Sequence, residues 1–164
     1  QNTQNLLERT RPMPNWCSNE VEIYGTKEDI TKFVEECFTE HKGQSVLDFN
    51  KILPEPAIGS YKLPKKDGTH NDGVQTELLD AMPDWWHWRN ENWGTKWNLV
   101  PNPKDDIYGY TIDIGGDSMS LSFDTAWSPP NGIHGEIVER YPSLDISWFY
   151  REDGMQFSGW LPYD

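Results

Sequence analysis

Apolar and polar residues alternate in the segment Glu20–Tyr24, where Val21 and Ile23 fall on one side and the polar residues on the other. A period of two residues predicts a β-strand with one buried face. Gly25 interrupts the alternation. The first regular element is therefore expected to be a half-buried strand that ends at this glycine.

Helical spacing of apolar residues begins directly after the strand. Thr26 is placed to cap the helix, with Asp29 three residues later in a variant of the capping box. The helix is expected to end near His41 and Lys42, whose type suits a helix C-terminus, with Gly43 just beyond. Its apolar stripe consists of Ile30, Phe33, Val34, Cys37 and Phe38.

The run Ser45–Leu53 predicts a second strand, which Pro54 and Pro56 end. The first unit of the chain is therefore expected to be β-α-β. The pattern breaks over residues 55–104, where glycines and prolines indicate loops and a short helix is expected over Gln75–Met82. We interpret residues 55–104 as an insertion packed on the domain.

Regular alternation resumes with a hairpin whose strands cover Tyr110–Ile114 and Met119–Phe123. A helix is expected next, with Ser128 as its N-cap and two prolines in its first turn. Two further strands, over Leu144–Tyr150 and Phe157–Trp160, complete a second unit of the form ββ-α-ββ.

These two units predict an α+β fold in which one antiparallel sheet carries two helices on one face. This is the ferredoxin-like plan, with a tryptophan-rich insertion and an extra edge strand. Residues 1–12 are expected to be a flexible N-terminal tail. Residues 13–164 are expected to form a single ferredoxin-like domain that contains the insertion at 55–104.

The chain carries a formal net charge of −13 and has a pI near 4.6. This balance disfavours direct binding to nucleic acid or to an anionic membrane, because both surfaces repel carboxylates. It is compatible with a basic protein partner, a cation, or mimicry of the charge of a nucleic acid. Solubility alone is a further explanation.

The two cysteines, Cys17 and Cys37, form no CxxC pair. Their number and spacing indicate neither a zinc site nor a disulfide framework, and favour a reduced, cytoplasmic protein. No stretch approaches the roughly 18 apolar residues of a membrane span. The polar residues 1–12 predict no signal peptide.

Nine of the 164 residues are tryptophan, and five of these fall within Trp85–Trp97. The cluster either packs as a small aromatic core or forms a recognition surface in which basic and amide side chains interleave with the rings. The run TAWSPP places Trp127 at a strand-to-helix corner, which is either purely structural or part of the same surface. The candidate partner- or ligand-binding residues are Trp85, Trp88, Arg89, Trp93, Lys96, Trp97 and Trp127.

No complete catalytic or metal-binding set is found, and no cofactor is implied. His87 lies three residues after Asp84 and is a candidate general base, but a local contact on a helix explains the pair equally well. His134 is expected on the surface of the second helix. Acidic residues such as Glu152 and Asp153 lack the spacing of an EF-hand, and the sequence contains neither an HExxH nor a GxSxG motif.

Four short runs, taken in order, resemble those of one family. They are MPNWCSN (Met13–Asn19), ILPEP (Ile52–Pro56), WRNENWGTKW (Trp88–Trp97) and FDTAWSPP (Phe123–Pro130). Together they resemble the YubB-type family of ferredoxin-like proteins of unknown function, which phages and plasmids encode. The resemblance spans about Met13 to Trp160. It implies a mobile-element origin in bacteria and the ferredoxin-like fold, and it assigns no catalytic residue.

Two functional hypotheses follow from the sequence. The first is a non-catalytic accessory protein of a phage or plasmid that binds a host protein, basic or itself nucleic-acid-binding, and antagonises a defence or regulatory factor. Aromatic residues would supply affinity and carboxylates would steer the partner. The second is a small enzyme or ligand-binding domain that uses the insertion as its pocket, with Trp93, Trp97, Trp127, His87 and Arg89 converging on one cavity.

Overall fold

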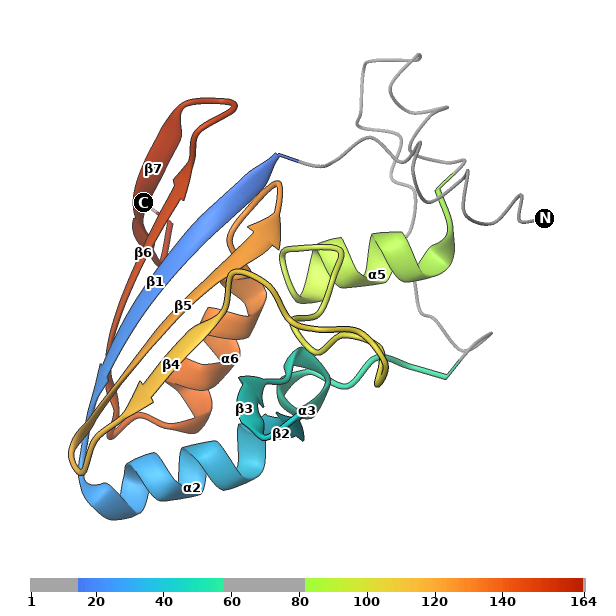
Figure 1. The fold of residues 1–164 in the computed structure, drawn as a ribbon. Helices are drawn as coiled ribbons and strands as arrows, with labels where there is room; N and C mark the ends of the chain where they lie inside the picture. Colours follow the sequence, from blue (N-terminus) through green and yellow to red (C-terminus); the bar gives the residue numbers. More distant parts are fainter. Residues whose placement is uncertain (1–14, 58–81, 164) are drawn as a thin grey trace.

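The computed structural model describes residues 15–57 and 82–163 of the chain (Figure 1). Its main sheet consists of β1 (Trp16–Tyr24), β4 (Thr111–Ile114), β5 (Ser118–Ala126), β6 (Asp145–Glu152) and β7 (Phe157–Leu161). The five strands lie in the order β4-β5-β1-β6-β7, and every neighbouring pair is antiparallel. The N-terminal strand is therefore at the centre of a sheet built from the C-terminal half of the chain.

Two helices lie on one side of this sheet: α2 (Lys27–Cys37), after β1, and α6 (Asn131–Arg140), between β5 and β6 (Figure 1). Because β5 and β6 both pair with β1, α6 connects two parallel strands across the strand between them. This order of strands and helices is the ferredoxin-like arrangement, with β7 as an extra edge strand. The fold class expected from the sequence is confirmed.

The core between the sheet and the helices follows from the alternation along the strands. In β1 the odd-numbered residues are buried, and Val21 is opposite Leu121 of β5 and Trp148 of β6. The helices add Phe33 and Ile137, which are fully buried. Burial of each such side chain contributes about 1.5–3 kcal/mol. The even-numbered residues of β1 consequently point to the other face of the sheet.

The first helix begins where the sequence predicts but ends earlier. The Thr26 hydroxyl accepts a hydrogen bond from the Asp29 amide at 3.2 Å, so Thr26 is the N-cap. The helix ends at Cys37, and Lys42 and Gly43 form the turn between two short strands, β2 (Phe38–His41) and β3 (Gln44–Leu47). Both turn residues have positive φ, 48° and 81°, as a two-residue hairpin turn of type I′ requires.

The strand expected over Ser45–Leu53 is wrong beyond Leu47. The Asp48 carboxylate accepts a hydrogen bond from the Asn50 amide at 3.0 Å and caps a short helix, α3 (Phe49–Ile52). An aspartate favours a helix start over a continuing strand because its side chain satisfies the first free amides. The strands β2 and β3 form a two-stranded sheet of their own, so the first unit is not the β-α-β unit that we expected.

The second unit is ββ-α-ββ as expected, but the start of its helix differs. The N-cap of α6 is Pro130, not Ser128. The Ser128 hydroxyl donates to the Gly94 carbonyl at 2.6 Å, and the Ser128 amide donates to the Ala126 carbonyl at 2.9 Å. Ser128 therefore closes a tight turn and ties it to the segment before β4, and it cannot serve as the helix cap as well.

Two expectations concern residues outside those described. They are the tail at residues 1–12 and the helix over Gln75–Met82, of which only Met82 is described, in a non-helical conformation. Within the described ranges, no helix is both long and apolar enough to cross a membrane.

Candidate functional site

The helix α5 (Asp84–Asn92) carries the first part of the tryptophan cluster, and Arg89 ties it to the domain. The Arg89 guanidinium donates to both carboxylate oxygens of Glu55, from Nε at 2.9 Å and from Nη2 at 2.8 Å. It also lies 4.9 Å and 5.2 Å from the ring centroids of Trp85 and Trp93. Because a bidentate pair fixes both partners in one geometry, Arg89 serves the internal packing of this segment.

Trp93 is a core residue and presents no surface to a partner. Its side chain is 0% exposed, its indole Nε1 donates to the Leu53 carbonyl at 2.9 Å, and its ring lies 5.7 Å from that of Phe49. This placement corrects our assignment of Trp93 to a recognition surface. Burial with a satisfied N–H group is the most favourable environment for so large an apolar ring.

The other members of the cluster are half-buried. Trp88 packs edge-on against Trp93 with ring centroids 5.6 Å apart. The Lys96 ammonium lies 4.6 Å from the centroid of the Trp97 ring, which is in turn 6.0 Å from that of Trp16. The cluster therefore packs largely on itself and on the domain. The candidate binding residues of intermediate burial are Trp85, Trp88, Arg89, Lys96 and Trp97.

Trp127 stands apart at the corner between β5 and α6. Its φ is 69°, a conformation rare for a bulky residue, and its side chain is 49% exposed. The Thr125 hydroxyl donates to the Ser128 carbonyl at 2.7 Å, and the Thr95 hydroxyl donates to the Ala126 carbonyl at 2.9 Å. Hydrogen bonds thus hold the backbone on both sides of Trp127, while its indole stays accessible.

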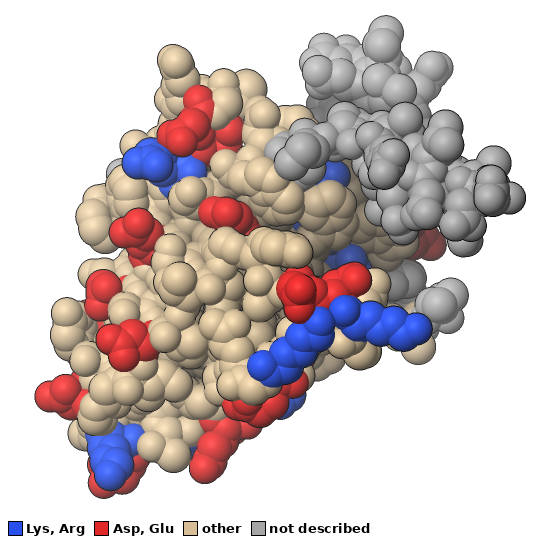
Figure 2. Space-filling view, in the orientation of Figure 1, with Lys and Arg blue, Asp and Glu red and all other residues tan. Residues whose placement is uncertain are grey.

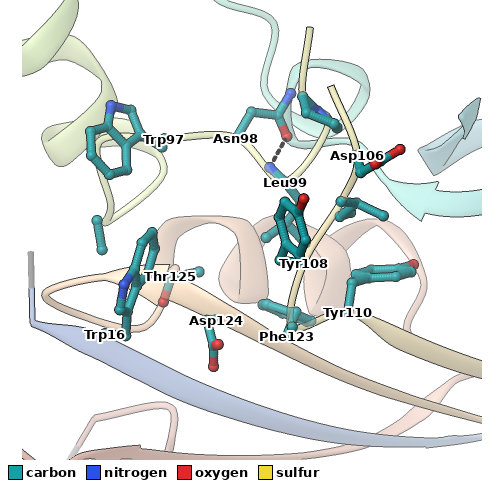
Figure 3. Close-up of a pocket in the computed structure, with 14 residues that line it drawn as sticks. Trp16, Trp97, Asn98, Leu99, Asp106, Tyr108, Tyr110, Phe123, Asp124 and Thr125 are labelled. Atoms are coloured by element: carbon teal, nitrogen blue, oxygen red, sulfur yellow. Dashed lines mark hydrogen bonds between the residues drawn. The ribbon is translucent and has the colours of Figure 1, made fainter. Parts of the chain in front are cut away.

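Within the part of the chain that the structure describes, the residues of the second hypothesis do not line one pocket. A pocket of about 400 Å³ lies beside Phe123–Ala126 of β5 (Figure 3). Trp97 is the one member of the expected set that lines it; Trp93, Trp127, His87 and Arg89 do not. His87 instead packs edge-on against Trp86, with ring centroids 5.0 Å apart.

The buried histidine and cysteine side chains of the core have surroundings that suit packing and not chemistry. His134, which we expected on the helix surface, is buried 5.6 Å from the Trp148 ring centroid, and burial lowers its pKa. Cys17 and Cys37 are free and buried, and burial raises the pKa of Cys17 to about 11, which makes it a poor nucleophile. Among the described residues, no group of three His, Cys, Asp or Glu side chains is placed to hold a metal ion.

The sheet face opposite the helices is open: within the described residues no helix packs on it (Figure 1). Figure 2 shows acidic side chains distributed among uncharged ones on this side of the molecule. We call this surface the open face. The strand registers place on it the carboxylates Glu20, Glu22, Asp113, Asp124 and Asp145, the base Arg151, and the aromatic residues Trp16, Tyr24, Phe149 and Trp160.

Aromatic rings and carboxylates are neighbours on the open face. Phe149 is opposite Glu20 in the register, and its ring centroid is 5.1 Å from that of Trp160, which is 61% exposed. Tyr24 is opposite Asp145 and is 53% exposed. Side chains directly opposite in an antiparallel pair are in contact range. The open face is thus a mixed surface of accessible rings and negative charges.

The negative charges of the open face are not neutralised by basic residues on the same face. Its one base, Arg151, is 3.0 Å from the carboxylate of Asp153 in the next turn. Asp124 accepts a hydrogen bond from the Ser18 hydroxyl at 3.3 Å, and partial burial raises the pKa of its carboxyl group. The open face therefore presents an anionic surface to any partner.

The sequence contained a signal for the open face that we did not use. The alternation that buries Val21 also puts Glu20, Glu22 and Tyr24 on the opposite side of β1. A polar strand face is ordinarily just the solvated side of a sheet. We left open whether the tryptophan cluster is a packed core or a recognition surface, and named its residues as binding candidates because tryptophan is enriched at interfaces. The sequence pattern could not show that Trp93 is buried.

Two comparisons with known proteins show what this chain is similar to. Residues 96–164 match the family described as "Ferredoxin-like domain in Api92-like protein". The chain is also similar to the uncharacterized protein YubB of Escherichia coli (strain K12), with 27% identity over 96 residues. The similarity covers 57% of this chain and 60% of YubB, so the chain spans less than two thirds of the length of that relative. No solved structure matches.

These similarities agree with the geometry. The family match covers β4 to β7 and α6 and confirms the ferredoxin-like fold. The similarity to YubB supports the relationship indicated by the four sequence runs. Since that relative is uncharacterized, it assigns no activity.

Proposed function

We propose that this chain is a non-catalytic accessory protein of a phage or plasmid, and that it binds a basic host protein in the bacterial cytoplasm through its open face. The observation that carries the proposal is the make-up of that face: accessible rings interleaved with carboxylates, and a single arginine that already has an acidic neighbour. Antagonism of a host defence or regulatory factor is the specific form of the proposal.

Each component of the open face has its own part in binding. Exposed rings such as Trp160 and Tyr24 are the anchors, because burial of an aromatic side chain at the centre of an interface is worth about 2 kcal/mol or more. The carboxylates around them attract a basic surface and raise the association rate. They also select against acidic partners, since unpaired like charges brought together are repelled.

The same surface disfavours nucleic acid. Aromatic residues on a four-stranded sheet can stack on RNA bases, and the open face also carries exposed rings. However, Glu20 is opposite Phe149 and Asp145 is opposite Tyr24. A nucleotide stacked on either ring would bring its phosphate towards a carboxylate. Mimicry of a nucleic acid remains a form of the proposal, because the basic partner could itself bind nucleic acid.

The experiment compares two double variants with equal charge change. Glu20→Lys/Glu22→Lys reverses two exposed carboxylates of the open face, and Glu35→Lys/Glu139→Lys reverses two exposed carboxylates on the helices. Each tagged protein is passed through bacterial lysate at low and high salt, and any basic protein retained by the wild type is purified and titrated against all three. We expect the open-face variant to lose at least tenfold in affinity and the helix variant to keep it.

Other outcomes contradict the proposal. Equal losses in both variants would show that binding follows net charge and not the open face. Retention of nucleic acid, but of no basic protein, by the wild type would show that the carboxylates do not select the partner as proposed.

The alternative, a small enzyme or ligand-binding domain that uses the tryptophan-rich insertion, has less support. Among the described residues its five proposed members do not line one pocket: Trp97 alone lines the pocket beside β5, and Trp93 is fully buried.

A further inference from the structure

We propose that the pocket beside β5 is a binding site for a cationic group of the alkylammonium or guanidinium type, held between aromatic rings and the Asp124 carboxylate. The proposal deepens the proposed function in one respect: a lysine or arginine side chain of the basic partner is one source of such a group.

The pocket exists because one edge of β5 is only partly paired. β4 pairs with residues of β5 up to Ser122, so Phe123–Ala126 have β1 on one side and, among the described residues, no strand on the other. The chain reaches this edge at Gly109, whose φ of +64° turns it towards Asp124. A Cβ at Gly109 would lie 2.6 Å from the Asp124 Oδ2 atom, so this approach requires glycine.

Aromatic rings stand on opposite sides of the pocket (Figure 3). Trp16 and Trp97 form one side, and Tyr108, Tyr110 and Phe123 the other. The second side has a fixed base, because the Tyr110 hydroxyl donates to the Ser45 carbonyl at 2.8 Å and accepts from the Leu47 amide at 3.2 Å. By contrast, Tyr108 is 85% exposed and free to pack on a bound group.

The charge of the lining selects a cation. Two carboxylates, Asp106 and Asp124, line the pocket, and no lysine, arginine or histidine does. Asp106 is already paired with Lys42 at 2.7 Å. Asp124 has no ion pair within the described residues and accepts a hydrogen bond from Ser18. An anionic ligand would be repelled here, whereas a cation would gain an uncompensated carboxylate at the rim.

The rings add to this preference. The face of an aromatic ring carries negative charge density, so a cation within about 6 Å of its centre is attracted. The chain already shows this contact next to the pocket, because the Lys96 ammonium lies 4.6 Å from the Trp97 centroid. Lys96 does not itself line the pocket. Cages of several aromatic rings are the arrangement by which proteins hold quaternary ammonium groups.

The test uses choline and its uncharged isostere 3,3-dimethylbutan-1-ol, titrated into the full chain at constant ionic strength. The readout is the indole N–H signals of Trp16 and Trp97 in a ¹H–¹⁵N spectrum, assigned with Trp16→Phe and Trp97→Phe. We expect choline to shift both signals saturably and to bind at least about threefold more tightly than the isostere. Equal binding of the two, or no saturable shift with either choline or Nα-acetylarginine amide, would overturn the proposal.

Two isosteric variants locate the charge. Asp124→Asn removes the carboxylate at the pocket, and Asp113→Asn removes one from the open face outside it. We expect the first to weaken choline about threefold to tenfold without changing binding of the isostere, and the second to have no effect. Equal effects of the two variants would show that choline responds to overall charge, which contradicts a site at Asp124.

A further arm distinguishes the sources of the cation. Nα-acetylarginine amide, titrated in the same way, tests whether a polypeptide side chain fits; binding of choline alone would indicate a free quaternary ammonium ligand. The Glu20→Lys/Glu22→Lys variant separates this proposal from the proposed function. If it keeps choline binding but the wild type shows no basic partner, the pocket stands and the proposed function fails. If the wild type binds a basic partner that the variant loses, but shows no saturable binding of choline or Nα-acetylarginine amide, the proposed function stands and the pocket proposal fails.

Discussion

The tryptophan segment, residues 82–99, and the open face are both rich in aromatic rings, but their rings have opposite surroundings. In the segment, the Arg89 guanidinium lies against Trp85 and Trp93, and the Lys96 ammonium lies against Trp97. On the open face, carboxylates lie opposite two of the rings, Glu20 opposite Phe149 and Asp145 opposite Tyr24. The first set of rings is packed or half-buried, and the second includes some of the most exposed aromatic side chains.

The difference follows from the electrostatics of an aromatic ring. A cation over the ring face is attracted to it, so a ring and an arginine on the same chain satisfy each other. A carboxylate gains nothing from the ring face. Phe149 and Glu20, which are opposite each other in the register, therefore do not satisfy each other, and both can contact a partner. The density of tryptophan in a sequence therefore does not identify a binding surface. The sign of the charges between the rings is the better indicator.

Removal of one tryptophan from each region would test the comparison with the largest expected effect. Trp93→Ala should lower the free energy of unfolding by about 3–5 kcal/mol, because it empties a fully buried site and leaves the Leu53 carbonyl without its donor. Trp160→Ala should cost under about 1 kcal/mol, since it removes one exposed ring contact. Urea unfolding of both variants measures this, and similar losses would contradict the contrast.

Two glycines of α6 test how closely the tryptophan segment is docked on the domain. A Cβ at Gly132 would lie 1.8 Å from the Asn92 carbonyl oxygen, whereas a Cβ at Gly135 meets nothing within 4 Å. We expect Gly132→Ala to destabilise by about 2–3 kcal/mol through this overlap. Gly135→Ala should be neutral or stabilising by about 0.5–1 kcal/mol, because alanine is the better helix former. Equal unfolding midpoints for the two variants would show that the segment is not held against α6.

The fold could be predicted from the sequence where apolar residues recur with the regular spacing of a strand or a helix. The alternation in β1 and β5 and the stripe of α2 placed Val21, Leu121 and Phe33 in the core correctly. The sequence was not sufficient at Lys42 and Gly43, where a helix end and a hairpin turn call for similar residues. The burial of Trp93 depends on contacts with Leu53 and Phe49, which are distant in the chain, so no local pattern could have predicted it.

The open face and the buried face should also differ in how their titrating groups affect stability. His134 lies under the sheet, and burial lowers its pKa below the ordinary value of 6.5. Between the two pKa values the unfolded chain binds more protons than the folded one, so stability falls as the pH is lowered through 6.5. We expect the free energy of unfolding to be constant above about pH 7.5 and to decrease from there towards pH 5.5.

His134→Gln is the control for this pH dependence, because it removes the titrating group and retains a side chain that can form hydrogen bonds. Urea unfolding at several pH values between 8 and 5.5, on the order of five points, avoids the range in which most carboxylates titrate. The decrease should be shallower in the variant than in the wild type. An unchanged slope would mean that other groups cause it.

The smallest expected change in stability is at a carboxylate of the open face. Glu22 is exposed, points to the same side of β1 as Glu20, and is opposite Ser120 and Ser147 in the two registers. Glu22→Gln keeps the shape of the side chain and removes one of two like charges, so the free energy of unfolding should rise by a few tenths of a kcal/mol at most. Affinity for a basic partner should fall in the same variant, with a weaker dependence on salt. A loss of more than about 1 kcal/mol in stability would mean that Glu22 has an internal partner. The charges of the open face would then be satisfied within the chain, as those of the tryptophan segment are, and the contrast between the two regions would fail.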